Sequence, residues 1–264
     1  MDHDFDVVEQ KIAEAEFFLS KMAKAGSSKF EFECYLSAFL ASSRTSTLAL
    51  QQFKHVEGFE DWYSKHRKAL KDSSIAKFFL DLRNAHLHGG QYPVRGGVFH
   101  RGTARYEFRT TESREPVPSS DIVSACRNFF ILILEIVHNS YVDLGVRIDS
   151  QQYYTKEHFS TLGRSIDDAE IEIYGWVCES LIEEDFDEDA RWSELRGKVY
   201  ECSINHLFYS YLGKITPQPI EPDHYADFAY TPEERGWIHP PAGYSSVEAY
   251  WEDSGITKPD YYGL

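Results

Sequence analysis

The stretch that decides the fold is SSIAKFFLDLRNAHLHGG, residues 73–90. Its apolar residues recur every three or four positions, which is the spacing of a helix that buries one face. Asp72-Ser73-Ser74 offers capping side chains before Ile75, and Gly89-Gly90 offers the permissive backbone that ends a helix. We therefore predict a helix from Ile75 to His88 with one apolar face packed in a core.

Helical spacing continues on both sides of this stretch. Upstream it predicts helices from Val8 to Ala25, from Lys29 to about His55 and from about Glu60 to Lys71. Downstream it predicts a strongly apolar helix from Ile122 to about Leu144. Residues 91–118, in contrast, combine glycines with alternating side chains, which indicates a β-hairpin or an ordered loop. These elements suffice for an up-and-down helical bundle with one insertion.

The sequence changes character after Gly145. Two more amphipathic helices are predicted, from Ile166 to Glu184 and from Asp189 to Leu212, with the acidic run 183–189 between them. From Thr216 onward, prolines and large aromatic residues alternate without a helical period. We expect this part to be an extended tail laid across the surface of the second region or of a partner.

Charge divides the chain at the same place. Residues 1–148 carry 19 Lys and Arg against 19 Asp and Glu, whereas residues 149–264 carry 8 against 24 and so hold the whole net charge of −16. We predict a mainly α protein with two regions. Residues 1–148 form a helical bundle with a small β-hairpin or loop insertion, and residues 149–264 form a small acidic α-helical region with an extended, Pro/aromatic-rich tail.

Composition argues against several other classes of protein. The four cysteines lie apart, without a pair at zinc-ligand spacing, so we expect free thiols, no metal and no other cofactor. The acidic N-terminus is unlike a signal peptide, and the longest apolar run, Phe129–Leu134, is too short to cross a bilayer. We therefore expect a cytoplasmic protein that does not enter a membrane. No Ser-His-Asp arrangement, phosphate-binding glycine loop or carboxylate metal cluster is visible.

The end of the predicted helix carries a set of residues suited to acid–base chemistry. Asn84 and His88 are four positions apart and share one face, and Arg83 lies at the border of that face and the apolar one. His88 falls in the last turn, where the helix dipole favours a protonated imidazole. An imidazole and a permanent cation could together cleave a phosphodiester. Arg83 and His88 are about 140° apart around the helix, so two antiparallel copies related by a two-fold axis would bring them together better than one chain does. This geometry predicts a homodimer with a composite site.

The pattern Arg83-Asn84-x-x-x-His88, near the end of a helix in a helical bundle, resembles the signature of HEPN domains. The residues around it strengthen the likeness: Tyr35–Leu40 followed by Arg44, Trp62-Tyr63, and Phe78-Phe79. The resemblance covers residues 8–145. It implies a metal-independent endoribonuclease in which the ribose 2′-hydroxyl attacks phosphorus and leaves a 2′,3′-cyclic phosphate.

The resemblance also implies a role for each residue of the motif. His88 would be the general acid or base, Arg83 would stabilise charge on phosphorus, and Asn84 would orient His88 or the phosphate. Proteins of this kind often act as toxins or antiviral effectors, and some pair with an antitoxin or a regulatory protein. The alternative is a non-catalytic HEPN-like dimeric scaffold that binds a protein or nucleotide partner through its acidic second half.

For the remaining polar residues we weigh a functional role against a structural one. Arg95, Arg101 and Arg105 lie in an arginine-rich stretch and could contact an RNA backbone, or form the solvated face of a hairpin. His86 falls on the apolar stripe, which favours a core or dimer-interface histidine over a catalytic one. Arg44 is expected to be a buried member of an ion pair, with Asp81 as one candidate partner. The acidic run is expected to be a solvated connection, and a sharper hypothesis is that it competes with RNA for the arginines.

Overall fold

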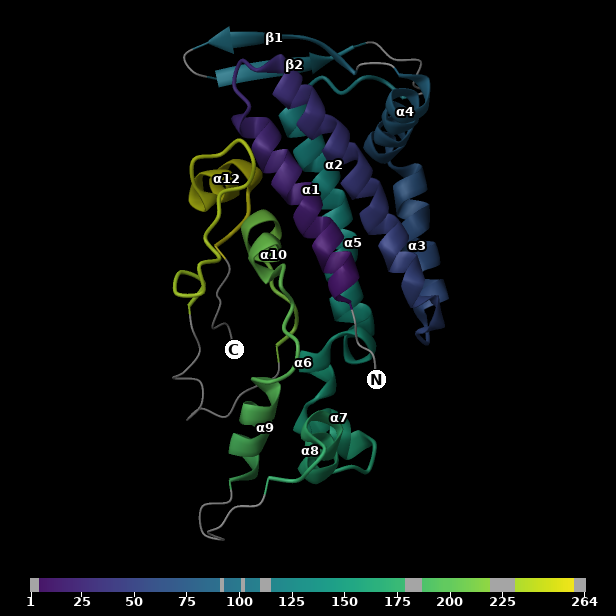
Figure 1. Cartoon of the computed structure of the whole chain (residues 1–264), viewed down its shortest axis with the longest axis vertical. Coiled ribbons are helices and arrows are strands. Elements are labelled where there is room, and N and C mark those ends of the chain that lie inside the picture. The colour runs from purple at the N-terminus through teal and green to yellow at the C-terminus, as the bar shows by residue number, and fades with distance from the viewer. Residues whose placement is uncertain are drawn as a thin grey trace.

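The computed structural model of the chain describes residues 5–90, 93–100, 103–109, 115–178, 187–218 and 231–258. Long helices run side by side along the upper part of an elongated molecule, and short helices form its lower end (Figure 1). The mainly helical fold class and the small antiparallel sheet are as predicted. In chain order the elements are α1 (Asp6–Lys24), α2 (Lys29–Ala49), the 3-10 helix η1 (Leu50–His55), α3 (Phe59–Asp72), α4 (Ser74–Gly89), β1 (Val94–His100), β2 (Thr103–Phe108), α5 (Ile122–Ile148), α6 (Ser150–Tyr153), α7 (Lys156–Thr161), α8 (Ile166–Tyr174), α9 (Glu188–Arg196), α10 (Asn205–Leu212) and α12 (Val247–Ser254).

The bundle is built around α5. α1 and α2 lie along this helix, and α3 and α4 lie beside α2 and also contact α5 (Figure 1). By length and composition α5 could cross a membrane, but 56% of its most apolar stretch of 18 residues is buried inside the molecule. The central helix of a soluble bundle has the same properties, because it is apolar on nearly every side.

Local signals set the ends of α4. The Ser73 hydroxyl caps its N-terminus by accepting a hydrogen bond from the amide of Ala76 at 3.4 Å. Gly90 ends it with a φ of 63°, the left-handed conformation that favours glycine. Between these caps, Phe78, Phe79 and Leu82 are buried in the core, as the helical spacing predicted.

The predicted hairpin is present between α4 and α5. β1 and β2 pair antiparallel, with Val98 opposite Arg105. The hairpin lies across the upper end of the bundle (Figure 1), where Tyr106 packs on Phe32 with ring centroids 4.1 Å apart and donates a hydrogen bond to the carbonyl of Gly26 at 3.1 Å. This contact fixes the middle of the sheet to the turn between α1 and α2.

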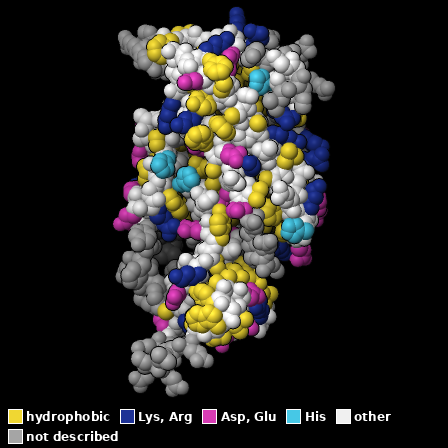
Figure 2. Space-filling model, viewed as in Figure 1, with side chains coloured by type: hydrophobic (Ala, Val, Ile, Leu, Met, Phe, Trp, Pro, Cys, Tyr) yellow, Lys and Arg dark blue, Asp and Glu magenta, His cyan; other side chains and the backbone are white. Residues whose placement is uncertain are grey.

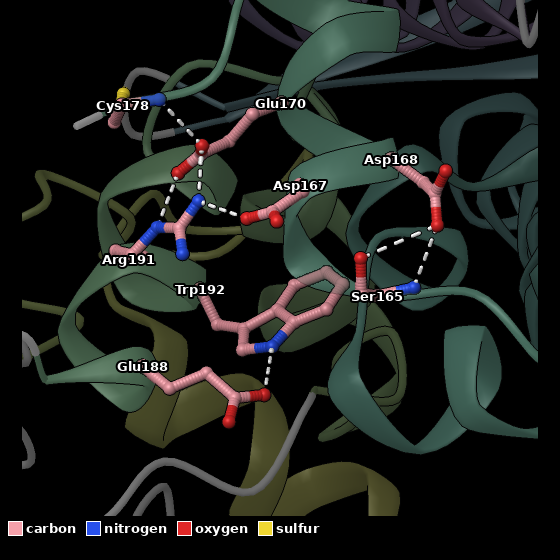
Figure 3. Close-up of polar contacts among 8 residues, drawn as sticks. All are labelled: Ser165, Asp167, Asp168, Glu170, Cys178, Glu188, Arg191 and Trp192. Carbon is pink, nitrogen blue, oxygen red and sulfur yellow. Dashed lines mark hydrogen bonds and ion pairs between the residues drawn. The ribbon is translucent and has the colours of Figure 1, made fainter.

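The lower end of the molecule has a small core of its own around Phe159 and Trp192. An ion-pair cluster holds α8 to α9 (Figure 3). Arg191 on α9 donates from Nε to Glu170 at 2.7 Å and from Nη2 to Asp167 at 2.7 Å, and Glu170 is only 1% exposed. Some of the acidic residues of this region therefore hold helices together rather than only facing solvent.

After α9 the chain returns to the bundle, where it is hydrogen-bonded to Glu9, a carboxylate of α1 that is 1% exposed. Glu9 accepts hydrogen bonds from the hydroxyl of Tyr141, from the hydroxyl of Tyr200 at 2.8 Å, and from the amide and hydroxyl of Ser203 at 2.7 and 2.6 Å. Beyond this point α10 packs on α5, and its residue Phe208 belongs to the main core. Residues on both sides of position 148 thus share one core.

The two helices predicted for the second half need correction, and so does the predicted tail. The helix predicted over Ile166–Glu184 ends at Tyr174, because Gly175 takes a φ of 80°; residues 179–186, with most of the acidic run, lie outside the described residues. The helix predicted over Asp189–Leu212 is two helices, α9 and α10, separated by residues 197–204.

The tail is also more ordered than predicted where the structure describes it. It contains α12, which rests on α10: Trp251 donates from Nε1 to the carbonyl of Ser210 at 3.1 Å, and Tyr250 donates to the carbonyl of Tyr211 at 3.0 Å. Arg127 of α5 donates to the carbonyl of Ala242. This part of the tail therefore packs on the bundle side of the molecule, not on the small lower core.

Candidate functional site

The predicted motif lies in the last two turns of α4. Arg83 is half-buried and Asn84 is exposed, and Arg83 donates from Nη1 to the Asn84 Oδ1 atom at 3.1 Å. The backbone of His88 belongs to the last turn of α4, but its side chain lies outside the described residues. In the described geometry, then, Asn84 orients the guanidinium of Arg83. His86, one turn before the helix end, is half-buried.

Arg83 lines a cavity of ≈ 670 Å³ between α2, η1, α3, α4 and the start of α5. The cavity wall carries a dense set of cations. Its basic members are Arg44, Lys54, Arg67, Lys71, Lys77 and Arg83. No Asp or Glu lines this cavity within the described part of the chain. In Figure 2, Lys and Arg side chains gather on the edge of the molecule that carries α3.

Most of these cations form no ion pair within the described part of the chain. Lys77 pairs with Glu115 at 3.4 Å, and Arg44 donates to the Thr47 hydroxyl at 3.1 Å. Apart from Lys77, the six cations form no ion pair with any residue that the structure describes. Lys54, Arg67, Lys71 and Lys77 are exposed, so solvent screens much of their mutual repulsion, whereas Arg44 and Arg83 are half-buried. The wall of the cavity is positively charged, which favours an anion over a cation there.

Two buried polar atoms at the cavity have no hydrogen-bond partner among the described residues: the hydroxyl of Ser43 and the Nε atom of Arg83. Ser43 is 1% exposed. Nearly all buried polar atoms in folded proteins are hydrogen-bonded, so unpartnered ones beside a cavity indicate groups that a ligand or ordered water completes. Both residues line the same cavity.

The structure separates the residues that the sequence grouped together. Arg95 and Arg105 are exposed on the hairpin and do not line the cavity, and Arg101 lies outside the described residues. The expected pairing of Arg44 with Asp81 is not formed, because Arg44 lies at the cavity and bonds to Thr47 instead. Sequence reasoning missed this set of cations, although Arg67 and Lys71 stand one helical turn apart and share a face.

Metal-ligand and thiol chemistry find less support. No group of three or more His, Cys, Asp and Glu residues is gathered in a way that could hold a metal, as far as the structure describes the chain. All four cysteines are free. Cys126 and Cys202 are buried, and burial raises the pKa of each thiol well above its usual value, which disfavours the nucleophilic thiolate.

No protein-family model, no curated protein sequence and no solved structure matches this chain.

Proposed function

We propose that this chain is a metal-independent endoribonuclease of the HEPN type, acting as a homodimer with a composite site of Arg83, Asn84 and His88. The observation that carries the proposal is the setting of Arg83. Its guanidinium is held by Asn84, lies at a cavity walled by cations, and precedes His88 by little more than one turn of α4. A guanidinium so placed is suited to bind a phosphodiester oxygen.

The reaction assigns one role to each residue. The 2′-oxygen bonds to phosphorus while the bond from phosphorus to the 5′-oxygen of the next nucleotide breaks. A proton leaves the 2′-hydroxyl, and a proton is delivered to the departing 5′-oxygen; His88 serves as base or acid in these transfers. Arg83 stabilises the negative charge that builds on the phosphoryl oxygens. Asn84 keeps the guanidinium in place.

The outer face of α4 supports the dimer. Leu80 is 47% exposed, and Asn84, one turn later on the same face, is also exposed. Leu48 of α2, which lines the same cavity as Leu80, is exposed as well. Burial of these leucines against a second copy would favour association. Two antiparallel α4 helices would then bring Arg83 of each copy toward His88 of the other.

The remaining parts of the proposal concern the setting of the reaction. Arg95, Arg101 and Arg105 of the hairpin segment are proposed to contact the RNA backbone. A cytoplasmic toxin or antiviral effector, restrained by an antitoxin or a regulatory protein, is the proposed biological role. The cationic cavity and the exposed hairpin arginines support an anionic substrate, although the protein as a whole is acidic.

The test is RNA cleavage by the purified chain in the presence of a chelator. Wild-type protein should yield fragments that end in 2′,3′-cyclic phosphate, and Arg83→Ala and His88→Ala should each abolish cleavage without changing the circular dichroism spectrum. His86→Ala, two residues before the proposed catalytic histidine, is the matched control and should remain active. Toxicity on expression should follow the same pattern.

A mixture of the two inactive variants tests the composite site directly. In a mixed dimer one site has both substitutions and the other has neither, so an equimolar mixture should recover about a quarter of wild-type activity. No recovery, or a chain that is monomeric at micromolar concentration, would contradict the shared site. A folded dimer that cleaves no RNA would instead support the non-catalytic scaffold.

A further inference from the structure

Two histidine side chains lie together at the surface of the molecule (Figure 2). His206 belongs to α10 and His239 to the described part of the tail, and their ring centroids are 6.1 Å apart. We propose that this pair binds a divalent transition-metal cation that prefers imidazole, such as Cu²⁺, Ni²⁺ or Zn²⁺, and so fastens the tail to α10. The inference goes beyond RNA cleavage and does not rest on it.

The separation of the two rings fits a shared metal. A metal lies about 2.1 Å from each imidazole nitrogen that binds it, which places the centres of two such rings roughly 5–6.5 Å apart, depending on the angle at the metal. The observed 6.1 Å falls within this range. His239 is exposed, so a rotation of its ring can turn a nitrogen toward the shared position. The pair therefore needs little movement to chelate a metal.

One hydrogen bond already prepares His206 as a ligand. Its Nδ1 atom lies 3.0 Å from the carbonyl oxygen of Ser203. A carbonyl only accepts, so in the neutral ring Nδ1 carries the proton and Nε2 keeps the lone pair that a metal requires. Metal-binding histidines commonly hold their second nitrogen in this way, because the bond fixes the tautomer and the direction of the ring. No residue that the structure describes forms a hydrogen bond with Nε2 of His206.

The backbone around His239 is held in place as well. Its amide donates to the carbonyl of Trp237 at 2.9 Å, and the same carbonyl accepts a hydrogen bond from the hydroxyl of Ser210 on α10 at 3.3 Å. Pro240 and Pro241 follow and restrict the backbone further. Both histidines therefore lie on fixed main chain before a metal binds, which lowers the entropic cost of binding.

An ion pair makes the same connection between the tail and the chain before α10. Arg235 of the tail pairs with Glu201 at 2.6 Å, and Glu201 is 45% exposed. Exposed ion pairs contribute little to stability, because solvent screens them. A metal that binds only the folded arrangement of His206 and His239 adds its binding free energy to stability, so it would hold the tail more firmly than the ion pair does.

The pair leaves part of the coordination sphere open. No group of three or more His, Cys, Asp and Glu residues is gathered around it within the described ranges. Water or a further ligand would complete the sphere. Structural zinc sites usually have four protein ligands, whereas two imidazoles predict weaker and reversible binding. The site should therefore respond to the concentration of free metal rather than retain one ion permanently.

The experiment is isothermal titration calorimetry of the untagged full chain, freed of metal by dialysis against a chelator. Cu²⁺, Ni²⁺, Zn²⁺ and Mg²⁺ are the probes. One Cu²⁺ ion per chain should bind in the micromolar range, Ni²⁺ and Zn²⁺ should bind more weakly, and Mg²⁺ should not bind, because imidazole prefers the first three in this order. The electron paramagnetic resonance spectrum of bound Cu²⁺ should show coupling to two imidazole nitrogens.

Substitutions test whether the two histidines act together. His206→Gln and His239→Ala should each weaken binding by at least about tenfold, because one imidazole alone cannot chelate. His55→Ala is the matched control and should bind as the wild type does. His55 is exposed and its Nδ1 atom also lies 3.0 Å from a carbonyl oxygen, that of Gln52, but its ring contacts Phe53 and no described histidine. If His206→Gln is misfolded by circular dichroism, His239→Ala decides, because its side chain is exposed.

Hydrogen exchange gives a second readout. Zn²⁺ should slow amide exchange in residues 235–241, and at about 100-fold excess over its dissociation constant it should raise the melting temperature by roughly 5 °C. Neither effect should occur in His239→Ala. Absence of binding by Cu²⁺, Ni²⁺ and Zn²⁺ at about 1 mM would overturn the inference and leave the two rings as an edge-to-face packing pair. Binding that survives both substitutions, or a Cu²⁺ spectrum with fewer than two nitrogens, would overturn it in favour of adventitious surface binding.

Discussion

Substitution of Glu9 by alanine should destabilise the whole chain. Glu9 is buried and accepts four hydrogen bonds, from Tyr141, from Tyr200 and, twice, from Ser203. Water can satisfy Tyr200 and Ser203 after the change, because both residues are exposed, but the hydroxyl of the buried Tyr141 would lose its partner. An unsatisfied buried donor costs about 1–3 kcal/mol, so we expect a loss of about 1–3 kcal/mol in the free energy of unfolding.

Urea denaturation followed by circular dichroism and by tryptophan fluorescence would measure this loss. For a chain of this size it corresponds to a fall of roughly 5 °C in melting temperature. Glu14→Ala is the control, because Glu14 lies on the same helix in a surface pair with Lys11 at 2.7 Å and should cost under about 1 kcal/mol. A Glu9→Ala variant within about 0.5 kcal/mol of wild type would refute the assignment of Glu9 as the tie between α1 and the late segment.

Three further predictions concern the lower region, its junction with the bundle, and the hairpin. Arg191→Ala leaves Glu170 buried without its cation and should cost about 3–5 kcal/mol, seen as faster hydrogen exchange in α8 and α9; unchanged exchange would contradict the role of the ion pair. Burial raises the pKa of Asp149 from 3.8 to about 6. The folded state therefore holds this proton more tightly than the unfolded state, so stability should fall by up to about 3 kcal/mol as pH rises through that interval. Asp149→Asn should remove this slope in urea midpoints, and a variant that keeps the slope would assign it to another group. Gly97→Ala would place a Cβ 2.6 Å from the tyrosine ring of the facing strand and should destabilise the hairpin by about 1–3 kcal/mol, whereas Gly96→Ala meets open space; equal melting temperatures would contradict this.

Local signals in the sequence were sufficient for the elements whose ends are set by their own residues. The Ser73 cap and Gly90 placed α4 within one residue at each end, and the glycines and alternating side chains of residues 91–118 predicted the hairpin. The border position of Arg83 also followed from helical spacing alone. These features depend on contacts within a few residues along the chain.

Features that depend on contacts between residues far apart in the sequence could not be predicted from local sequence patterns. The break between α9 and α10 includes Ser203, whose amide bonds to a carboxylate on the first helix rather than to the helix that amphipathic spacing predicted. The cavity cations Arg44, Arg67 and Arg83 come from three helices, and the period of one helix says nothing about the face of another. The prediction that Arg44 pairs with Asp81 was wrong for this reason.

The tie between Glu9 and Ser203 also bears on how the chain is made. The two residues are separated by 194 positions. At synthesis rates of about 5–20 residues per second, α1 waits roughly 10–40 s for these donors to leave the ribosome. Until then a charged side chain faces an unfinished core, so the nascent bundle stays open to chaperones and proteases, and any translational pause before Ser203 prolongs that exposure.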